Sequence, residues 1–214
     1  MRFKVEAGTR LGLPDARGTT IERDIRDLGI EGVTSVEVID LFFLEGEIGA
    51  DQVDRICRDL LTDRVSEEYA VNRPLRDGPL TNIVEVAFNP GVMDPVALTA
   101  ESGIRDLGAE VPVTVRTGKK YVLRGQIKPH ELQVITEKLL LNQVVEHRVE
   151  TDERVFTPPA YSFKRETLAL LGRREEELVR LSRERGLYLN SREMVRIRDY
   201  FENLGREPTD VEIE

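Results

Sequence analysis

The spacing of hydrophobic and polar residues predicts alternating strands and helices from the start of the chain. Residues 3–7 (Phe-Lys-Val-Glu-Ala) alternate apolar and polar positions, which is typical of a strand with one buried face. A helix is predicted to open at Leu13-Pro14-Asp15 and to end at Gly29, which can adopt the left-handed backbone of a helix end. Its apolar stripe recurs at i, i+4 and i+7, at Ile21, Ile25 and Leu28.

Residues 33–47 are rich in β-branched and aromatic residues and exceed the length of a usual strand. We therefore predict two strands with a turn or bulge near Asp40. A second helix follows, with Asp51 near its start and an apolar face made of Val53, Ile56, Cys57, Leu60 and Leu61. Residues 65–71 complete the unit as a last strand. This order, β-α-β-β-α-β, is the ferredoxin-like arrangement, in which both helices cover one face of a sheet.

A pentapeptide that occurs twice shows that this unit is duplicated. Ile25-Arg26-Asp27-Leu28-Gly29 returns letter for letter as Ile104-Arg105-Asp106-Leu107-Gly108, 79 positions later. The same shift aligns further identical residues without a gap, among them Gly12 with Gly91, Asp15 with Asp94, Gly46 with Gly125 and Glu67 with Glu146. Self-similarity at a fixed spacing indicates an internal repeat, and two copies make a duplicated domain, because a solenoid needs at least three.

The second copy repeats the predicted elements of the first. They are a strand over 83–88, a helix with Ala100, Ile104 and Leu107 inward, strands within 113–126, a helix with Leu132, Ile135, Leu139 and Leu140 inward, and a strand over 144–149. Each sheet would leave one apolar face bare, and such a face must be covered. We expect the two copies to stack about a pseudo-two-fold axis.

The predicted fold class is α+β: two tandem ferredoxin-like units form a pseudo-dimer, and a short all-helical segment follows. Proline and glycine between Asn72 and Pro79, and again Thr157-Pro158-Pro159, disfavour regular structure and mark the boundaries. The predicted division is repeat 1 over residues 1–72, a linker over 73–81, repeat 2 over 82–150, a linker over 151–161 and the helical segment over 162–214.

The helical segment is predicted from three apolar stripes and a final cap. The three helices are expected over 163–171, 174–185 and 191–204, each ending at a glycine. Thr209-Asp210-Val211-Glu212 has the pattern of a capping box, which starts a helix. Because the chain ends two residues later, we expect a longer parent protein.

Composition narrows the class of protein. Charged residues make up 33% and the net charge is −9, so long-range attraction to nucleic acid or anionic lipid is not expected. The chain has no apolar run long enough to span a membrane and no signal-peptide pattern at its N-terminus. Cys57 is the only cysteine, which excludes an intrachain disulfide and fits a reducing compartment. We expect a soluble, cytoplasmic protein without nucleic-acid or membrane partners.

The familiar catalytic motifs are missing from the sequence. It contains no Gly-x-x-x-x-Gly-Lys-Ser/Thr phosphate loop, no Gly-x-Gly-x-x-Gly after a strand and no Gly-x-Ser-x-Gly elbow. His130 and His147 are the only histidines, so a metal site would need mostly carboxylate ligands. We interpret His130 as a surface or capping residue and Cys57 as a small core residue. No catalytic, cofactor-binding or metal-binding residue is assigned.

One stretch offers a candidate binding site, made of Arg116, Gly118, Lys119 and Lys120. A glycine in a bend between strands can expose backbone N–H groups, and lysines beside it could hold a phosphate or contact a partner. The simpler interpretation is a hairpin turn with solvated lysines. Copy one has Val38-Ile39-Asp40-Leu41 at the positions of residues 117–120, so any such site is confined to copy two.

The motifs of each copy resemble the PurS family, the small subunit of phosphoribosylformylglycinamidine (FGAM) synthase. That family shows a helix entrance with an aspartate, a helix ending in Leu-Gly, an Arg-x-Gly-Lys bend and a closing Leu-x-Asn-x-Val-x-Glu-x-Tyr segment. Copy two has Asp94, Leu107-Gly108, residues 116–119 (Arg-Thr-Gly-Lys) and residues 140–146, with Arg148 in place of the tyrosine. Copy one has Asp15, Leu28-Gly29 and residues 61–69 ending in Tyr69, with Asp63 for the asparagine and no Gly-Lys bend.

The tail is similar to the opening of the linker region in PurL, the synthase subunit. Residues 204–214 (Leu-Gly-Arg-Glu-Pro-Thr-Asp-Val-Glu-Ile-Glu) carry this similarity. In that family the helix runs on into a Trp-Ser-Glu-His motif with a functional histidine. Together the two resemblances cover nearly the whole chain.

The resemblance implies the non-catalytic, N-terminal assembly portion of an FGAM synthase, a ligase of de novo purine biosynthesis. The parent enzyme is implied to use ATP, Mg and glutamine to convert formylglycinamide ribonucleotide to the amidine. The implied partners are the rest of the synthase polypeptide and a PurQ-like glutaminase, and self-association stays open. This chain alone is expected to be inactive and to hold no cofactor.

Two alternatives come from other classes of protein. Paired ferredoxin-like units often bind a ligand at their interface, so the chain could be a ligand-sensing regulatory module that uses Lys119 and Lys120. A self-contained enzyme is the weakest alternative, because the familiar catalytic motifs are missing.

Overall fold

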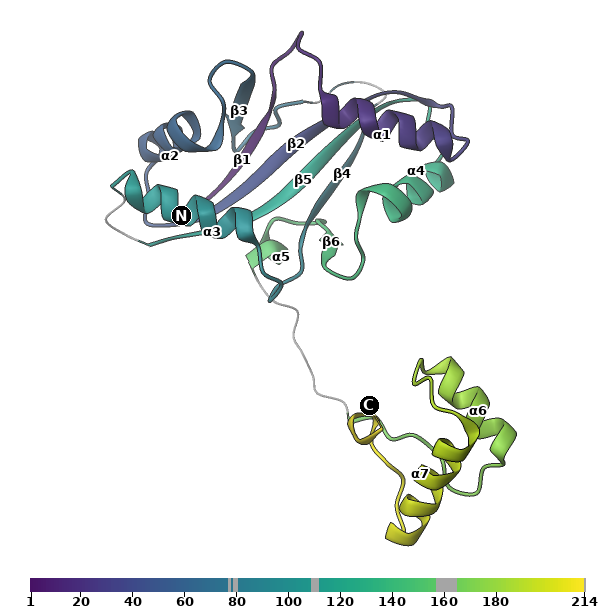
Figure 1. The fold of residues 1–214 in the computed structure, drawn as a ribbon. Helices are drawn as coiled ribbons and strands as arrows, with labels where there is room; N and C mark the ends of the chain where they lie inside the picture. Colours follow the sequence, from purple (N-terminus) through teal and green to yellow (C-terminus); the bar gives the residue numbers. More distant parts are fainter. Residues whose placement is uncertain (77, 79–80, 109–111, 157–164, 214) are drawn as a thin grey trace. The chain divides into compact units, whose positions relative to one another are not determined.

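The computed structural model describes residues 1–76, 78, 81–108, 112–156 and 165–213 (Figure 1). The chain divides into two units, Met1–Pro159 and Ala160–Glu214. The predicted boundary at Thr157-Pro158-Pro159 lies outside the described residues. Each unit is considered by itself.

The first unit contains the two copies, and both have the same order of elements. Copy one consists of β1 (Arg2–Thr9), α1 (Ala16–Asp27), β2 (Val33–Gly46), α2 (Ala50–Ile56), the π-helical turn η1 (Cys57–Leu61) and β3 (Glu67–Val71). Copy two consists of β4 (Thr81–Phe88), α3 (Pro95–Asp106), β5 (Val113–Gly125), α4 (Pro129–Ile135), the π-helical turn η2 (Thr136–Leu140) and β6 (Glu146–Arg148). A short helix, α5 (Glu153–Phe156), follows. The predicted repeat and its mixed α and β content are confirmed.

The prediction of two strands within residues 33–47 is wrong in one detail. β2 is a single strand of 14 residues without a turn at Asp40, and β5 is likewise a single strand of 13 residues. Asp40 stays in the strand because its backbone pairs with Lys119, and its two carboxylate oxygens accept hydrogen bonds from Arg17 Nη1 at 2.8 and 2.9 Å. β2 pairs with β5 along its whole length and with β1 over residues 39–45 only.

The six strands of the described residues form one sheet in the order β3-β1-β2-β5-β4-β6. β2 and β5 pair antiparallel along their full length at its centre, with Asp40 opposite Lys119. These two residues are also equivalent in the repeat, so the pseudo-two-fold axis passes between them. The copies are thus joined edge to edge, and the expectation that their sheets stack face to face is wrong.

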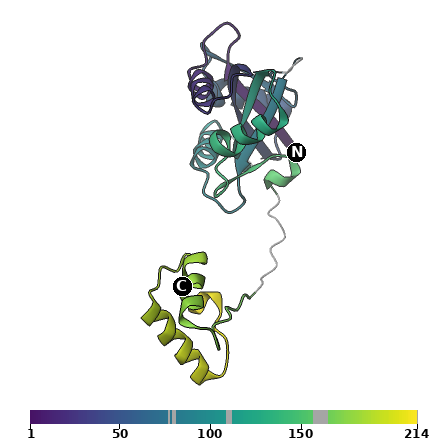
Figure 2. The ribbon, with the colours of Figure 1, turned by 90° about the vertical axis from the view of Figure 1, so that its right-hand side faces the viewer.

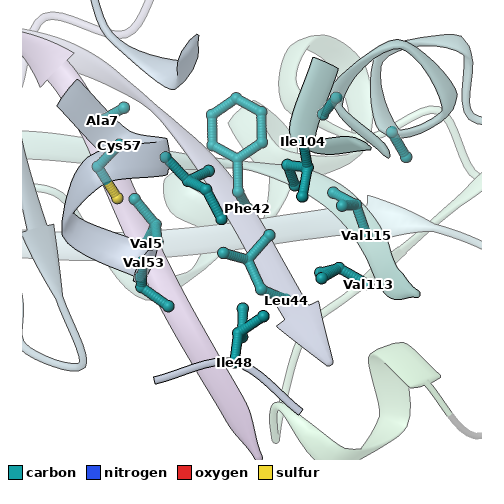
Figure 3. Packing of buried hydrophobic residues seen from close by; sticks show 13 residues of the cluster. Val5, Ala7, Phe42, Leu44, Ile48, Val53, Cys57, Ile104, Val113 and Val115 are labelled. Carbon is teal, nitrogen blue, oxygen red and sulfur yellow. The ribbon is translucent and has the colours of Figure 1, made fainter. Parts of the chain in front are cut away.

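Helices α1 to α4 lie on one face of this sheet, as the edge-on view shows (Figure 2). Two hydrophobic cores fill the space beneath them, and each core contains residues of both copies. The first joins Val5, Leu44, Val53 and Cys57 of copy one to Ile104, Val113 and Val115 of copy two (Figure 3). The second joins Ile25, Val36 and Val38 of copy one to Val84, Leu123, Ile135 and Leu140 of copy two. Neither copy closes a core by itself.

The opposite face of the sheet is covered by short segments and by charged side chains. Val155 of α5 packs with Leu41, Phe43 and Ala87. The ring of Phe156 meets that of Phe43 edge to face, with 6.5 Å between centroids. We call this side of the sheet the open face, because helices α1 to α4 do not cover it.

The second unit contains α6 (Glu175–Glu184), α7 (Ser191–Leu204) and the 3-10 turn η3 (Asp210–Glu212) around a core that includes Leu170, Leu178 and Met194. α7 begins at the Asn190 cap and ends at the left-handed Gly205, as predicted. The capping box predicted at Thr209 is also present, because the Glu212 carboxylate accepts the Thr209 N–H at 2.9 Å.

The predicted helix over 163–171 is wrong for its described part, residues 165–171, and residues 163 and 164 lie outside the described residues. This segment instead lies against the end of the chain. Thr167 forms a β-bridge with Thr209, and the Leu168 N–H donates to the Pro208 carbonyl at 2.9 Å.

In the described parts of the chain, no helix has the length and apolar character needed to cross a bilayer.

Candidate functional site

The predicted site residues Arg116, Gly118, Lys119 and Lys120 all lie in the middle of β5, against β2. No bend exposes the glycine. A Cβ atom on Gly118 would lie 2.4 Å from the carbonyl oxygen of Val86, so the glycine permits close contact with β4. Arg116 and Lys119 are exposed, whereas Lys120 is buried. The loop on which phosphate binding was argued is therefore not present, and the four residues form part of the seam between the copies.

Lys120 reaches across the open face to Glu6 of copy one. Its Nζ lies 2.9 Å from both carboxylate oxygens, and the two side chains are 3% and 5% exposed. The second Glu6 oxygen also accepts the Leu75 N–H at 2.8 Å. A buried charge without a partner is very costly, so each group depends on the other.

A second ion pair runs in the opposite direction, from copy one to copy two. Lys4 Nζ lies 2.7 Å from Glu85 and 3.2 Å from Asp152, and it sits 5.6 Å from the centre of the Phe43 ring. Burial disfavours the charged amine, but the hydrogen bond and charge of Glu85 outweigh it and raise the pKa of Lys4. Glu6 and Glu85 are repeat equivalents. The 79-residue repeat aligns these two glutamates in the sequence, but their ion pairs with Lys120 and Lys4 were not predicted.

Arg76, from the segment that joins the copies, holds three strands together on the same face. Its guanidinium donates to Glu37 of β2 at 2.8 Å, to Glu68 of β3 at 2.7 Å and to the Thr9 carbonyl of β1 at 2.8 Å. The hydrogen bond from Arg76 lowers the pKa of Glu68. Glu37 is shared, because Arg124 of β5 pairs with its other oxygen.

A cavity of about 380 Å³ opens beside these ion pairs. Its lining is Lys4, Glu6, Asn72, Arg73, Pro74, Ile83, Glu85, Lys120 and Asp152. Its three carboxylates are engaged by Lys4 and Lys120. Within the described ranges, no three histidine, cysteine or carboxylate side chains gather as metal ligands. These residues do not fit a nucleotide with its magnesium ion.

Two equivalent aspartates fix the helices on the other face to the long strands. Asp94 caps α3 by accepting the Ala97 N–H at 2.9 Å, and its other oxygen accepts the Thr117 N–H of β5 at 2.9 Å. Asp15 does the same in copy one, accepting the N–H groups of Gly18 at 3.1 Å and of Val38 at 2.7 Å. The aspartate at the helix entrance, noticed in the sequence, therefore joins a helix to a strand.

The closing segments of the two copies are also built alike. The side chain of Asp63 accepts the Val65 N–H at 2.8 Å, and Glu67 accepts the Asp63 N–H at 2.8 Å. Asn142 and Glu146 repeat this arrangement in copy two, with distances of 3.2 and 2.9 Å. The Asn-x-Val-x-Glu pattern thus encodes a locked turn before the last strand.

Equivalent small cavities lie where the first strand of each copy leads into its helix, but their chemistry differs. The cavity in copy one, about 240 Å³, has a charged lining that includes Arg10, Glu22, Glu37 and Arg76. The cavity in copy two, about 190 Å³, has fewer charged residues in its lining, Asp94 and Arg116, beside Phe88, Met93 and Leu98. We call these the charged end and the apolar end.

The reactive residue types lie apart from one another. Cys57 is fully buried, and burial raises the pKa of its thiol to about 12, as expected for a core residue. His130 is exposed in the first turn of α4. His147 lies on β6, opposite Ala87.

Comparison with protein families identifies both parts of the chain. The PurS model, described as phosphoribosylformylglycinamidine (FGAM) synthase, matches residues 2–74 and again 81–153. The chain belongs to this family. A second model, the formylglycinamide ribonucleotide amidotransferase linker domain, matches residues 178–214. No curated protein matches the chain significantly.

The two matches confirm the resemblance seen in the sequence. Tandem PurS domains followed by the linker domain indicate the N-terminal assembly portion of FGAM synthase in purine biosynthesis. These domains imply interaction with other parts of FGAM synthase. The family also implies ATP and Mg for the parent enzyme.

Proposed function

We propose that this chain is a non-catalytic assembly module that bridges the synthase and the glutaminase of FGAM synthase in the cytoplasm. It would hold no cofactor of its own and would bring the ammonia-producing and ammonia-using enzymes together. The observation that carries the proposal is the difference in charged residues between the charged end and the apolar end of one continuous sheet.

The two copies differ in charge at equivalent positions of these cavities. Arg116 of the apolar end stands at the repeat position of Glu37 in the charged end. Both ends expose apolar side chains that normally prefer burial: Met93 is 74% exposed at the apolar end, and Leu11 is 77% exposed at the charged end. Exposed apolar side chains grouped around a hollow are typical of protein contact sites. A module with unlike ends is suited to two different partners.

The ion pairs of the open face support a structural role. Lys4, Lys120 and Arg76 are each bound by carboxylates of the same chain. Their charges therefore stabilise the sheet and its linking segment, and a substrate would have to displace them.

The test is to mix the purified chain with the remaining synthase polypeptide and with a PurQ-like glutaminase, and to measure association by sedimentation velocity. We expect binding to both and no turnover by the chain alone. Met93→Glu should weaken binding of one partner and Leu11→Glu, near the charged end, that of the other. Val65→Glu is the matched control, because Val65 is equally exposed but lies outside both cavities. Failure of the wild-type chain to bind either protein would refute the proposal.

The second candidate function is ligand sensing, for which the open-face cavity beside Lys120 and Glu6 provides space, with both of its lysines already paired with carboxylates. A ligand bound to the folded state raises the melting temperature. A thermal-shift screen with nucleotides and phosphorylated metabolites would show such a rise for a sensor. The assembly function predicts no shift with these compounds.

A further inference from the structure

The two strands that meet at the centre of the sheet carry opposite charges. Those of β2 are all acidic: Glu37, Asp40 and Glu45. Those of β5 are all basic: Arg116, Lys119, Lys120 and Arg124. Neither strand contains a charge of the other sign. Equivalent strands of a duplicated unit have thus diverged in charge where they pair with each other.

We propose that the seam between β2 and β5 is a recognition surface. Its charges favour pairing of copy one with copy two and disfavour pairing of either copy with a second copy of itself. Specificity of this kind requires a penalty for the wrong pairing as well as a gain for the right one.

The residues at the pseudo-two-fold axis show most simply why pairing of a copy with itself is unfavourable. Asp40 and Lys119 are equivalent residues and lie opposite each other. If a copy paired with itself in the same register, this residue would face its own duplicate. Asp40 would meet a second Asp40, or Lys119 a second Lys119, and like charges directly opposite destabilise a sheet.

The next charged contact gives the same result. Glu37 of copy one pairs with Arg124 of copy two. The repeat equivalent of Arg124 in copy one is Glu45, and that of Glu37 in copy two is Arg116. Self-pairing would therefore place Glu37 against Glu45, or Arg116 against Arg124. Each wrong pairing replaces an ion pair with a repulsion.

The buried ion pair does not add to this penalty. Lys120 neutralises the buried Glu6, and the repeat equivalent of Lys120 in copy one is Leu41. In a pair of two first copies, however, Lys4 of each copy would reach Glu6 of the other, because Glu6 is the repeat equivalent of Glu85, which Lys4 contacts. The proposed specificity therefore rests on the charges of β2 and β5.

Fixed pairing has a structural consequence. A self-paired assembly would have two charged ends or two apolar ends, whereas pairing of unlike copies gives one of each. The charge pattern thus secures the asymmetry of the module, whichever partners its ends bind.

The test builds both wrong seams inside the full chain. Lys119→Asp with Arg124→Glu makes these two positions of β5 acidic, so that Asp40 and Glu37 of β2 face like charges, as in a pair of two first copies. Glu37→Arg with Asp40→Lys imitates copy two against itself. A four-site variant combines all these changes and restores opposite charges with reversed sign. The matched control for the first variant is Arg23→Glu with Lys138→Asp, which makes the same change of net charge at exposed positions away from the seam.

The melting temperature of each two-site variant is expected to fall by several degrees, and that of the control much less. The four-site variant should lose clearly less than the sum of the two losses, although Arg17 and Arg76 lose their acidic partners in it. Added salt should reduce the losses of the two-site variants, because salt screens repulsion between exposed charges. Losses that simply add in the four-site variant would overturn the proposal.

Discussion

Individual charged residues form ion pairs that join the two copies. Lys120 and Glu6 are buried together at the seam, although their sequence positions are far apart. Lys4 and Glu85 cross the sheet in the opposite direction. Buried ion pairs add little net stability compared with apolar residues, but breaking one leaves a costly unpaired charge. These pairs therefore specify the arrangement more than they strengthen it.

Replacing Lys120 with methionine should leave Glu6 buried without a cation. We expect the free energy of unfolding to fall by roughly 3 to 5 kcal/mol, measured by urea denaturation at neutral pH. The double variant Glu6→Gln with Lys120→Met should recover most of this loss, because the neutral amide can still accept the Leu75 N–H. Equal losses in the single and double variants would contradict the pairing.

The sequence did not predict these contacts, and the reason is physical. Lys119 and Lys120 looked alike beside a glycine, but one is exposed and the other buried. Successive residues of a strand point to opposite faces. Which lysine is buried depends on β5 being one continuous strand, and its glycine suggested a turn.

At the scale of elements, the caps and turns followed from local sequence, whereas strand length did not. Asp15 and Asp94 open their helices, and Gly29 and Gly108 end them with positive φ angles. Such features depend on neighbouring residues, so the sequence reveals them. The 14-residue length of β2 depends on β5, which supplies a partner along its full length. A single copy read by itself contains no sign of that partner.

Asp94→Ala should remove both the cap of α3 and the carboxylate oxygen that accepts the Thr117 N–H of β5. Because these donors are buried, we expect a loss of about 2 to 3 kcal/mol in the free energy of unfolding. Asp15→Ala is the matched comparison and should cost less, since Asp15 is more exposed. A loss within about 0.5 kcal/mol of zero for Asp94→Ala would show that the contact is unimportant.

The segment between the copies makes stability depend on pH through Glu68. Arg76 lowers the pKa of this carboxyl, so its contribution is present above the usual value near 4.5 and disappears as the pH falls through the folded-state pKa. Glu68→Gln should therefore lose less stability than the wild type between about pH 7 and about pH 3. Glu47→Gln, at an exposed position, should follow the wild type. The measurement is urea unfolding across this range, and identical curves for Glu68→Gln and wild type would contradict the assignment.

At the scale of the whole first unit, the two copies form one folding body. Ile104 of copy two lies in the core that holds Val5 and Val53 of copy one (Figure 3). Ile25 of copy one lies in the core that holds Val84 and Ile135 of copy two. The repeat was visible in the sequence, but this exchange of helices was not, because the matching apolar patterns of the two copies give no sign of which core each helix joins.

The most direct test is native-state hydrogen exchange on the full chain, with wild type compared to Ile104→Ala. Interlocked cores predict one common opening free energy for the protected amides of β1, β2, β4 and β5. The substitution should create a cavity in a shared core and lower that value equally in both copies. A decrease confined to copy two, with copy one unchanged, would show two independent domains and contradict the account.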